Sequence, residues 1–302
     1  MNKTNKTTGL IAMGIVVLIY GVSYISREAL GGKVSTTAIL AIQMGIMTVF
    51  FAIYNLLFHK SFKVDKKDLG WIVASGLFGT TFFNGFTILG INAVGATISS
   101  LLFSFAAAFA LIIEIVLFHR KKTVLGFTSI IISLIGIFIL MDMDLADLAA
   151  TNFTGYLLAL GSVVAWVIYT FLCDHIPEKY DKTVVLSYQA VVGVITTVPF
   201  AFMGATDPGA FSDFSVLANL LFLGLFNSSI AYFLNMYAIK NIGVTLSNLL
   251  LNFLPVVTML LAIVINHTFP TAPQIVGGIL ILCSVFMLNK DQKNIDELAK
   301  AN

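Results

Sequence analysis

The sequence predicts an all-α membrane protein of ten transmembrane helices, arranged as two inverted five-helix repeats. Three observations predict this fold: the chain is very apolar, its apolar runs are long enough to cross a membrane, and its second half echoes its first. Hydrophobic residues make up 58% of the 302 residues and charged residues only 11%, whereas about a quarter of a soluble domain is charged. A chain of this composition belongs in a bilayer.

Ten apolar runs approach or reach the length of a membrane span, which is about 20 residues. They cover residues 9–26, 36–58, 69–91, 95–118, 123–141, 154–173, 183–203, 215–239, 243–266 and 272–289. Lysines precede the first run as in a signal peptide, but no cleavage site followed by a soluble domain is present, so this run is expected to remain as a span. The charged segment 290–302 is expected to form a cytoplasmic tail.

The sequence repeats itself at about half its length. Residues 76–81 (GLFGTT) return as residues 224–229 (GLFNSS), and residues 95–99 (GATIS) return as residues 243–247 (GVTLS), both at an offset of 148. Nearer the N-terminus the offset is 146. The expected five-helix repeats are residues 8–141 and residues 154–289. Two successive copies with an odd number of spans cross the membrane in opposite directions. Such inverted repeats are an architecture of secondary transporters.

The lysines and arginines lie mostly on one side of the predicted membrane. If the N-terminus is cytoplasmic, fifteen of these 17 residues lie on the inside, and only Arg27 and Lys33 lie outside. Cytoplasmic loops carry an excess of positive charge. Both termini are therefore expected on the inner side of a bacterial cytoplasmic membrane.

Polar and aromatic side chains recur at helical spacing inside the predicted spans, and matched positions of the two copies carry them. Such groups are costly at bilayer depth, so we predict that they line a solute cavity between the repeats. The predicted lining residues are Tyr20, Tyr24, Gln43, Asn84, Trp166, Tyr169, Gln189, Tyr232, Asn235, Asn248 and Asn252. The alternative is that the polar groups only hydrogen-bond one helix to another.

Single residues in the spans have candidate roles in a transport cycle. Glu114 is the only acidic residue within a span, and it either carries a coupling proton or pairs with a loop lysine. Pro255 is expected to kink the middle of its span, as a hinge or as an ordinary kink. Arg27 and Glu28 are expected to pair at the outer end of the first span, either as a gate or as a plain interfacial pair.

The sequence shows no sign of catalytic or metal chemistry. The four histidines lie at predicted span ends without metal-ligand spacing, and no nucleotide-binding or nucleophile motif is present. Cys173 and Cys283 lie in or beside apolar segments, so no disulfide is expected. The lysines lie in short loops and not along one face, which disfavours nucleic acid. No catalytic residue, metal or cofactor is predicted.

Two motifs resemble those of a known family. Residues 20–24 (YGVSY) in the first span and residues 251–257 (LNFLPVV) in the ninth are similar to EamA-type members of the drug/metabolite transporter superfamily. The resemblance covers nearly the whole chain and implies ten spans and secondary transport. Members move amino acids, aromatic metabolites, choline and other organic cations. This chain departs from the family at some positions. It has Gln43 where many members have arginine, and Ala107 where the fourth span of the family has proline.

The sequence therefore predicts a transporter, and not an enzyme, that exports a small organic metabolite such as an amino acid by alternating access. Uptake of a choline-like quaternary amine is the alternative, because aromatic faces attract cations. An anionic solute is disfavoured because no lysine or arginine is expected at mid-depth. The expected partners are the solute, the lipid bilayer and protons, for a monomer or homodimer. A membrane-embedded enzyme acting on lipid headgroups remains the alternative of another class.

Overall fold

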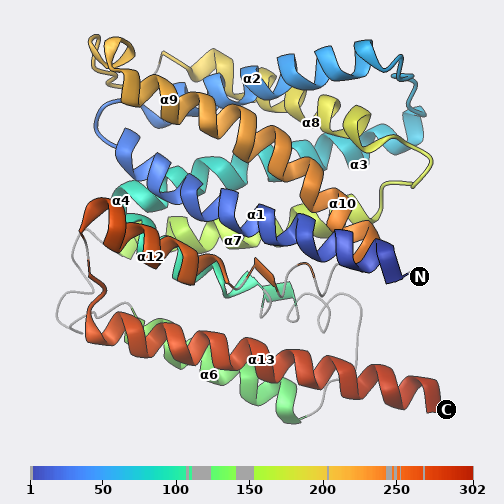
Figure 1. Ribbon diagram of the computed structural model, residues 1–302, viewed down its shortest axis with the longest axis vertical. Coiled ribbons are helices and arrows are strands. Elements are labelled where there is room, and N and C mark those ends of the chain that lie inside the picture. Colours follow the sequence, from blue (N-terminus) through green and yellow to red (C-terminus); the bar gives the residue numbers. More distant parts are fainter. Residues whose placement is uncertain are drawn as a thin grey trace.

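In the computed structural model every regular element of the described residues is helical (Figure 1). The structure describes residues 3–106, 109–110, 124–140, 153–202, 204–242, 247, 250–251, 253–267 and 269–301. Among them six helices are long and apolar enough to cross a membrane: Lys6–Leu30, Thr36–Leu57, Lys66–Phe103, Phe153–Cys173, Lys182–Phe200 and Phe214–Ile242. Shorter apolar helices cover Val124–Gly136, Leu254–Ile265 and Ala272–Ser284. The chain is a multi-span membrane protein.

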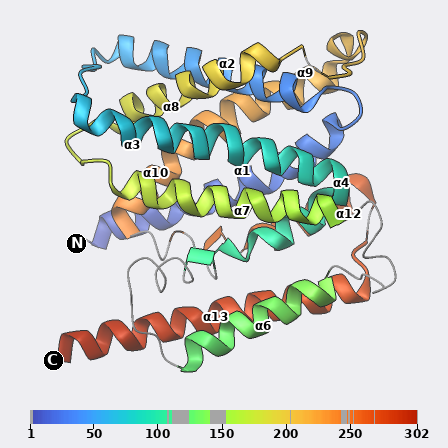
Figure 2. The ribbon, with the colours of Figure 1, turned by 180° about the vertical axis from the view of Figure 1, so that it is seen from behind.

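The helices lie roughly side by side (Figures 1 and 2). The elements of the first half are α1 Lys3–Leu30, α2 Thr36–Leu57, α3 Lys66–Gly76, η1 Leu77–Phe82, α4 Phe83–Phe103 and α6 Val124–Leu140. Those of the second half are α7 Phe153–Asp174, α8 Lys182–Thr197, η3 Val198–Phe200, η4 Ala210–Ser212, α9 Phe214–Phe222, η5 Leu223–Ala231, α10 Tyr232–Ile242, α12 Leu254–Asn266 and α13 Ala272–Ala301. Helices α6 and α13 pack against each other, and this pair stands apart from the others at one side of the bundle (Figures 1 and 2).

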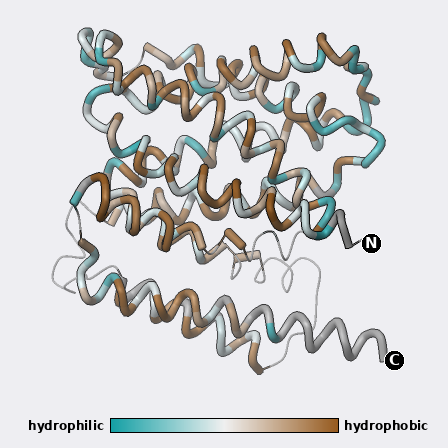
Figure 3. The backbone as a smooth tube through the Cα atoms, in the orientation of Figure 1, coloured by the Kyte–Doolittle hydropathy of each residue, from teal (hydrophilic) through white to brown (hydrophobic). Residues whose placement is uncertain are grey.

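Both chain termini lie at the same end of the bundle, which we call the termini end, and the opposite end is the far end (Figure 1). Hydrophilic segments gather at these ends, where the helices are joined, and the middle of the helices is mainly hydrophobic (Figure 3). The turn at Gly95, with φ 83° and ψ 165°, separates two helical stretches between the third and fourth predicted spans. A positive φ suits glycine, which has no Cβ to clash with the backbone.

The repeated hexapeptide lies in an unusual helical conformation in both halves of the chain. Residues Leu77–Phe82 (η1) and Leu223–Ala231 (η5) are π-helices that interrupt longer helical rods. They contain residues at matched positions, that is, at the offset of 148. A π-helix shifts the backbone hydrogen bonds by one residue and is often found at functional sites.

Matched residues also form ion pairs at opposite ends of the bundle. Lys33 Nζ lies 3.1 Å from Asp213 Oδ2 at the far end, and Lys179 Nζ lies 2.5 Å from Asp65 Oδ2 at the termini end. Lys33 corresponds to Lys179 at the offset of 146, and Asp65 corresponds to Asp213 at 148. Each aspartate directly precedes a helix, α3 or α9. Each end of the bundle therefore has an ion pair, and the two ion pairs are made by equivalent residues of the two halves.

Candidate functional site

Three helices bring four aromatic rings together in the interior of the bundle. Tyr20 of α1, Trp166 and Tyr169 of α7, and Tyr232 of α10 are at most 5% exposed. The ring centroids of Tyr20 and Trp166 lie 6.0 Å apart at an interplanar angle of 90°. The Trp166 ring lies 6.2 Å from Tyr232 and 5.3 Å from Tyr169. Such edge-to-face and tilted pairs are the arrangements that aromatic rings favour.

A chain of polar side chains lies against these rings. Arg27 Nη2 donates to Asn84 Oδ1 over 2.6 Å, and Gln43 Nε2 donates to the same oxygen over 3.2 Å. Gln43 Nε2 also contacts Ser228 Oγ at 2.5 Å. Asn84 Nδ2 in turn lies 3.3 Å from Tyr232 Oη. We call these five residues the polar chain, and it joins α1, α2, α4, η5 and α10.

The π-helix η1 supplies backbone groups to this centre. The carbonyl of Gly79 accepts hydrogen bonds from Asn84 Nδ2 at 3.0 Å and from Tyr232 Oη at 2.7 Å. A Cβ on Gly79 would lie 2.4 Å from Cδ2 of Tyr169, so only glycine lets this ring approach η1 so closely. The matched residue in η5 is Asn227, which is also buried.

Several buried polar atoms at this centre make no hydrogen bond. Within the described part of the chain, Tyr20 Oη, Arg27 Nε, Gln43 Oε1 and Trp166 Nε1 have no partner. Buried polar groups in folded proteins are nearly always paired, and exceptions call for a physical explanation such as a bound water, ion or ligand. Here four exceptions share one cluster, which marks it as a place where a polar molecule would be stabilised.

Comparison with known proteins assigns the sequence to a family. A sequence model described as the EamA-like transporter family matches residues 7–142 and 153–290. The chain belongs to the EamA-like transporter family. The protein is therefore a membrane transporter.

Similar proteins carry transporter names. An uncharacterized transporter of Archaeoglobus fulgidus is 24% identical over 278 residues, which are 92% of this chain and 97% of the relative. The uncharacterized transporter YoaV of Bacillus subtilis is 20% identical over 92% of this chain and 96% of its own length. A solved crystal structure of a protein with 16% identity superposes with a TM-score of 0.65, covering 95% of this chain and 96% of that one. These likenesses span the whole fold.

Most of the lining residues predicted from the sequence and described by the structure lie in or beside this centre. Tyr24 is buried on α1, and its ring belongs to the same apolar core as those of Tyr20 and Trp166. Gln189 of α8 is buried to one side, where its Nε2 donates to Ser75 Oγ over 2.8 Å. Asn235 is buried on α10, but among the described contacts no hydrogen bond joins it to the polar chain. Asn248, Asn252 and Glu114 lie outside the described residues.

The expectation for Arg27 was wrong. The sequence placed it at the outer end of the first span beside Glu28, with no cation at mid-depth. In the structure Arg27 is 1% exposed and bonds to Asn84, while Glu28 Oε1 accepts the backbone N–H of Ala96. An arginine side chain is long enough to leave the end of its helix and reach the interior. Register places Arg27 two helical turns after Tyr20 on the same face, but register does not decide whether a long side chain near a helix end turns to the interface or to the interior.

Pro255 lies at the start of a helix and not in the middle of one. The sequence placed this residue in the middle of a kinked span, but in the structure it lies in the first turn of α12, which begins at Leu254. Proline costs no helical hydrogen bond there, because the first N–H groups of a helix have no partner within the helix. Its role as a hinge stays a prediction.

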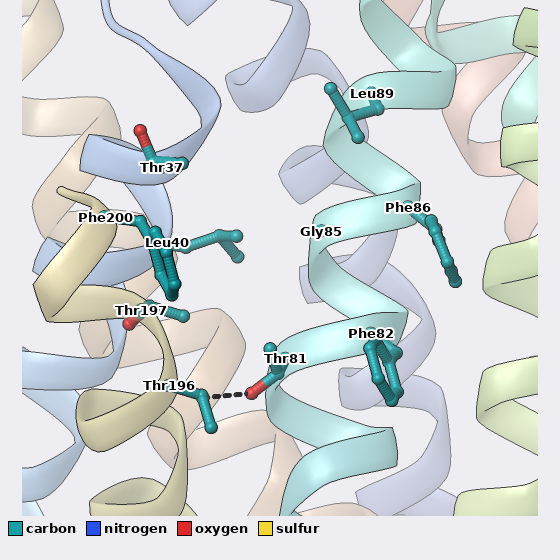
Figure 4. Close-up of a pocket in the computed structure, with 10 residues that line it drawn as sticks. All are labelled: Thr37, Leu40, Thr81, Phe82, Gly85, Phe86, Leu89, Thr196, Thr197 and Phe200. Carbon is teal, nitrogen blue, oxygen red and sulfur yellow. Dashed lines mark hydrogen bonds between the residues drawn. The ribbon is translucent and has the colours of Figure 1, made fainter. Parts of the chain in front are cut away.

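A separate hollow opens on the side of the bundle between α2, α4 and α8 (Figure 4). Its volume is about 220 Å³, and its lining is almost wholly apolar, including Leu40, Phe82 and Phe200. The hydroxyls of Thr81 and Thr196 lie 2.6 Å apart within it and bond to each other (Figure 4). The hollow shares no residue with the polar chain.

Proposed function

We propose that the protein is a secondary transporter that exports a small organic metabolite, such as an amino acid, across the bacterial cytoplasmic membrane. In this proposal residues 8–141 and 154–289 are two inverted repeats of five transmembrane helices each. Both termini, with the tail 290–302, lie in the cytoplasm. The repeats rock around a solute held at the centre and expose it to the two sides in turn.

The observation that carries the proposal is the group of unpaired polar atoms among the buried rings. Tyr20 Oη, Trp166 Nε1 and Arg27 Nε can donate hydrogen bonds, and Gln43 Oε1 can accept them. A small solute with both donors and acceptors would pair these atoms while its carbon skeleton contacts the rings. Small-molecule sites are mostly apolar with a few convergent polar groups, and the residues at this centre have that composition.

The equivalent ion pairs at the two ends support the alternating part of the proposal. A cycle that opens each end in turn requires two gates of similar construction, and the matched pairs Lys33–Asp213 and Lys179–Asp65 have the same residue types in the same positions. Weak exposed pairs suit a gate, because each contributes little stability and can break at low cost.

A choline-like quaternary amine is the second candidate solute. The rings of Trp166, Tyr20 and Tyr232 lie within 6.4 Å of one another, measured between centroids, and aromatic faces attract cations. Arg27 speaks against it, because a buried guanidinium beside the same rings repels a second cation.

Flux through reconstituted vesicles tests the proposal. Vesicles loaded with a radiolabelled amino-acid mixture should release label faster with the wild-type protein than with Asn84→Ala, by at least about tenfold if Asn84 organises the polar chain. Gly14→Ala is the matched folding control, because a Cβ at this exposed position meets no atom within 4 Å. Equal release from protein-free and wild-type vesicles, for amino acids and for choline, would rule the transport proposal out.

A pH gradient tests the proton as the coupling ion. Glu114 is the candidate carrier, so Glu114→Gln should leave solute exchange at equal pH intact and abolish its acceleration by a pH gradient. Acceleration that persists in the variant would exclude Glu114 from coupling.

A further inference from the structure

Arg27 is a buried cation that has no acidic partner among the residues the structure describes. The residue is 1% exposed, and within the described part of the chain its only hydrogen bond runs from Nη2 to the neutral amide oxygen of Asn84. Its neighbour Glu28 is directed to the backbone of Ala96. No ion pair involving Arg27 occurs among the described residues.

Such a charge is expensive to bury. Removing a guanidinium from water is costly, and a single hydrogen bond to a neutral amide oxygen offsets only part of that cost. A protein keeps a buried arginine of this kind either because a ligand supplies the negative charge or because the side chain braces neighbouring helices. The unpaired Nε points to the first explanation, since a brace needs no free donor.

The free donor lies on the edge of the guanidinium that recognises carboxylates. Nε and the adjoining terminal nitrogen present two parallel N–H groups, a geometry that matches the two oxygens of a carboxylate. The terminal nitrogen Nη2 carries two N–H groups, and one of them donates to Asn84 Oδ1. The guanidinium is thereby oriented before any ligand arrives.

A second group beside Arg27 suits the other charge of an amino acid. Gln43 Nε2 shares the oxygen Asn84 Oδ1 with Arg27, so the two side chains are near neighbours. The amide oxygen Gln43 Oε1 is buried and has no partner among the described residues. It can accept a hydrogen bond from an ammonium group, which the faces of Tyr20 and Trp166 also attract.

We propose that Arg27 binds the carboxylate of the transported solute and makes the carrier selective for zwitterionic amino acids over amines and amides. The proposal rests on the transport function proposed above. Gln43 receives the solute's ammonium group, and Asn84 is a positioning residue for both. The matched position in the second half of the chain is Cys173, so the carrier has one carboxylate site and binds the solute in one orientation.

Thermal unfolding of the purified full-length protein tests this assignment. The probes are an equimolar mixture of the twenty amino acids, the matched mixture of their amides, choline and inorganic phosphate. A ligand that binds the folded state raises the melting temperature by mass action. The amino-acid mixture should raise it, at concentrations at least about tenfold lower than any effect of the amides.

The variants Arg27→Gln and Arg27→Lys separate binding from bracing. Glutamine keeps a donor for Asn84 without the charge, so Arg27→Gln should fold and lose the preference for acids over amides. Arg27→Lys keeps the charge without the planar edge and should retain part of the preference. A structural brace predicts instead that both variants lower the melting temperature and leave the preference unchanged.

Other outcomes overturn the carboxylate assignment. These are a wild-type protein stabilised equally by acids and amides, stabilised by choline or phosphate alone, or stabilised by no probe. Failure here is distinct from failure of the transport proposal. Choline flux through wild-type vesicles would leave transport standing and remove the role of Arg27, whereas amino-acid binding through Arg27 without any flux would do the reverse.

Discussion

The ends of the bundle and its centre differ in how far the two halves of the chain agree. At the ends, Lys33 and Asp213 form the same contact as their counterparts Lys179 and Asp65. At the centre, matched positions carry different chemistry: Tyr20 corresponds to Trp166, Arg27 to Cys173, and Asn84 to Tyr232. Agreement at the ends suits a symmetrical scaffold, and disagreement at the centre suits the recognition of one asymmetrical molecule.

The two ends also differ in the number of bonds that hold them. At the termini end Lys179 also contacts Asp68, and Lys60 pairs with Asp181. Tyr180 Oη adds a hydrogen bond to Asp68 at 2.7 Å. At the far end, the bonds among the described residues include one ion pair and the hydrogen bonds from Asp207 N to Lys33 O and from Ser35 N to Thr206 Oγ1. More ion pairs therefore hold the termini end than the far end among the described residues.

The largest expected effect comes from a methyl group added at the centre. Gly79→Ala should lower the free energy of unfolding by about 3 kcal/mol, the upper end of the range for overpacking, because its Cβ would overlap the ring of Tyr169. Asn227→Ala, at the matched position of η5, removes atoms and should cost less. Unfolding in detergent measures both, with Gly14→Ala as the control. Equal losses at the two positions would mean that the two π-helices are equivalent in packing.

The two matched glutamines should differ in their effect on solute binding. Gln43 bonds to Asn84 and Ser228 at the centre, whereas Gln189 bonds to Ser75 at one side. Gln43→Ala should weaken solute binding by about tenfold, the effect of losing about one hydrogen bond to a charged group. Gln189→Ala should weaken it less. Titration of solute against each variant gives the two affinities, and the reverse order would move the site toward α8.

Loss of Lys179 should lower the melting temperature more than loss of Lys33. Lys179→Met removes contacts to two aspartates, and Lys33→Met removes a contact to one. The melting temperature should therefore fall more for Lys179→Met, although both changes are small because these ion pairs are exposed to solvent. Added salt should reduce the difference. A larger loss for Lys33→Met would reverse the order of the two ends.

Acid should weaken the ion pairs at both ends of the bundle. Of the predicted effects, this one should be the smallest. The hydrogen bond from Lys179 lowers the pKa of Asp65, and that from Lys33 lowers the pKa of Asp213. A carboxyl group with a lowered pKa stabilises the fold above its unfolded pKa of about 4, and this contribution is lost as the pH falls through the folded value. The melting temperature of wild type should thus drop below about pH 4. The double variant Asp65→Asn/Asp213→Asn should drop less, and an identical drop would show that other groups control acid stability.

Register along the helices predicted much of the centre but not how its side chains are joined. Tyr20, Trp166 and Tyr232 recur at helical spacing in apolar runs, so their shared burial follows from periodicity. The destination of Arg27 could not be predicted, because a long side chain near a helix end can reach either the interface or the interior. The π-helices could not be predicted either, since the matched hexapeptides carry no residue pattern that separates them from an α-helix.

The most direct test of the account is counterflow of a radiolabelled amino-acid mixture into vesicles that contain the wild-type protein or Asn84→Ala. Asn84 accepts hydrogen bonds from Arg27 and Gln43 and donates one to Tyr232. The variant Asn84→Ala therefore loses the hydrogen bonds that hold these side chains together. The account predicts accumulation of label with wild type and at least about tenfold less with the variant. Equal accumulation with the two proteins would contradict the claim that this buried centre holds the transported solute.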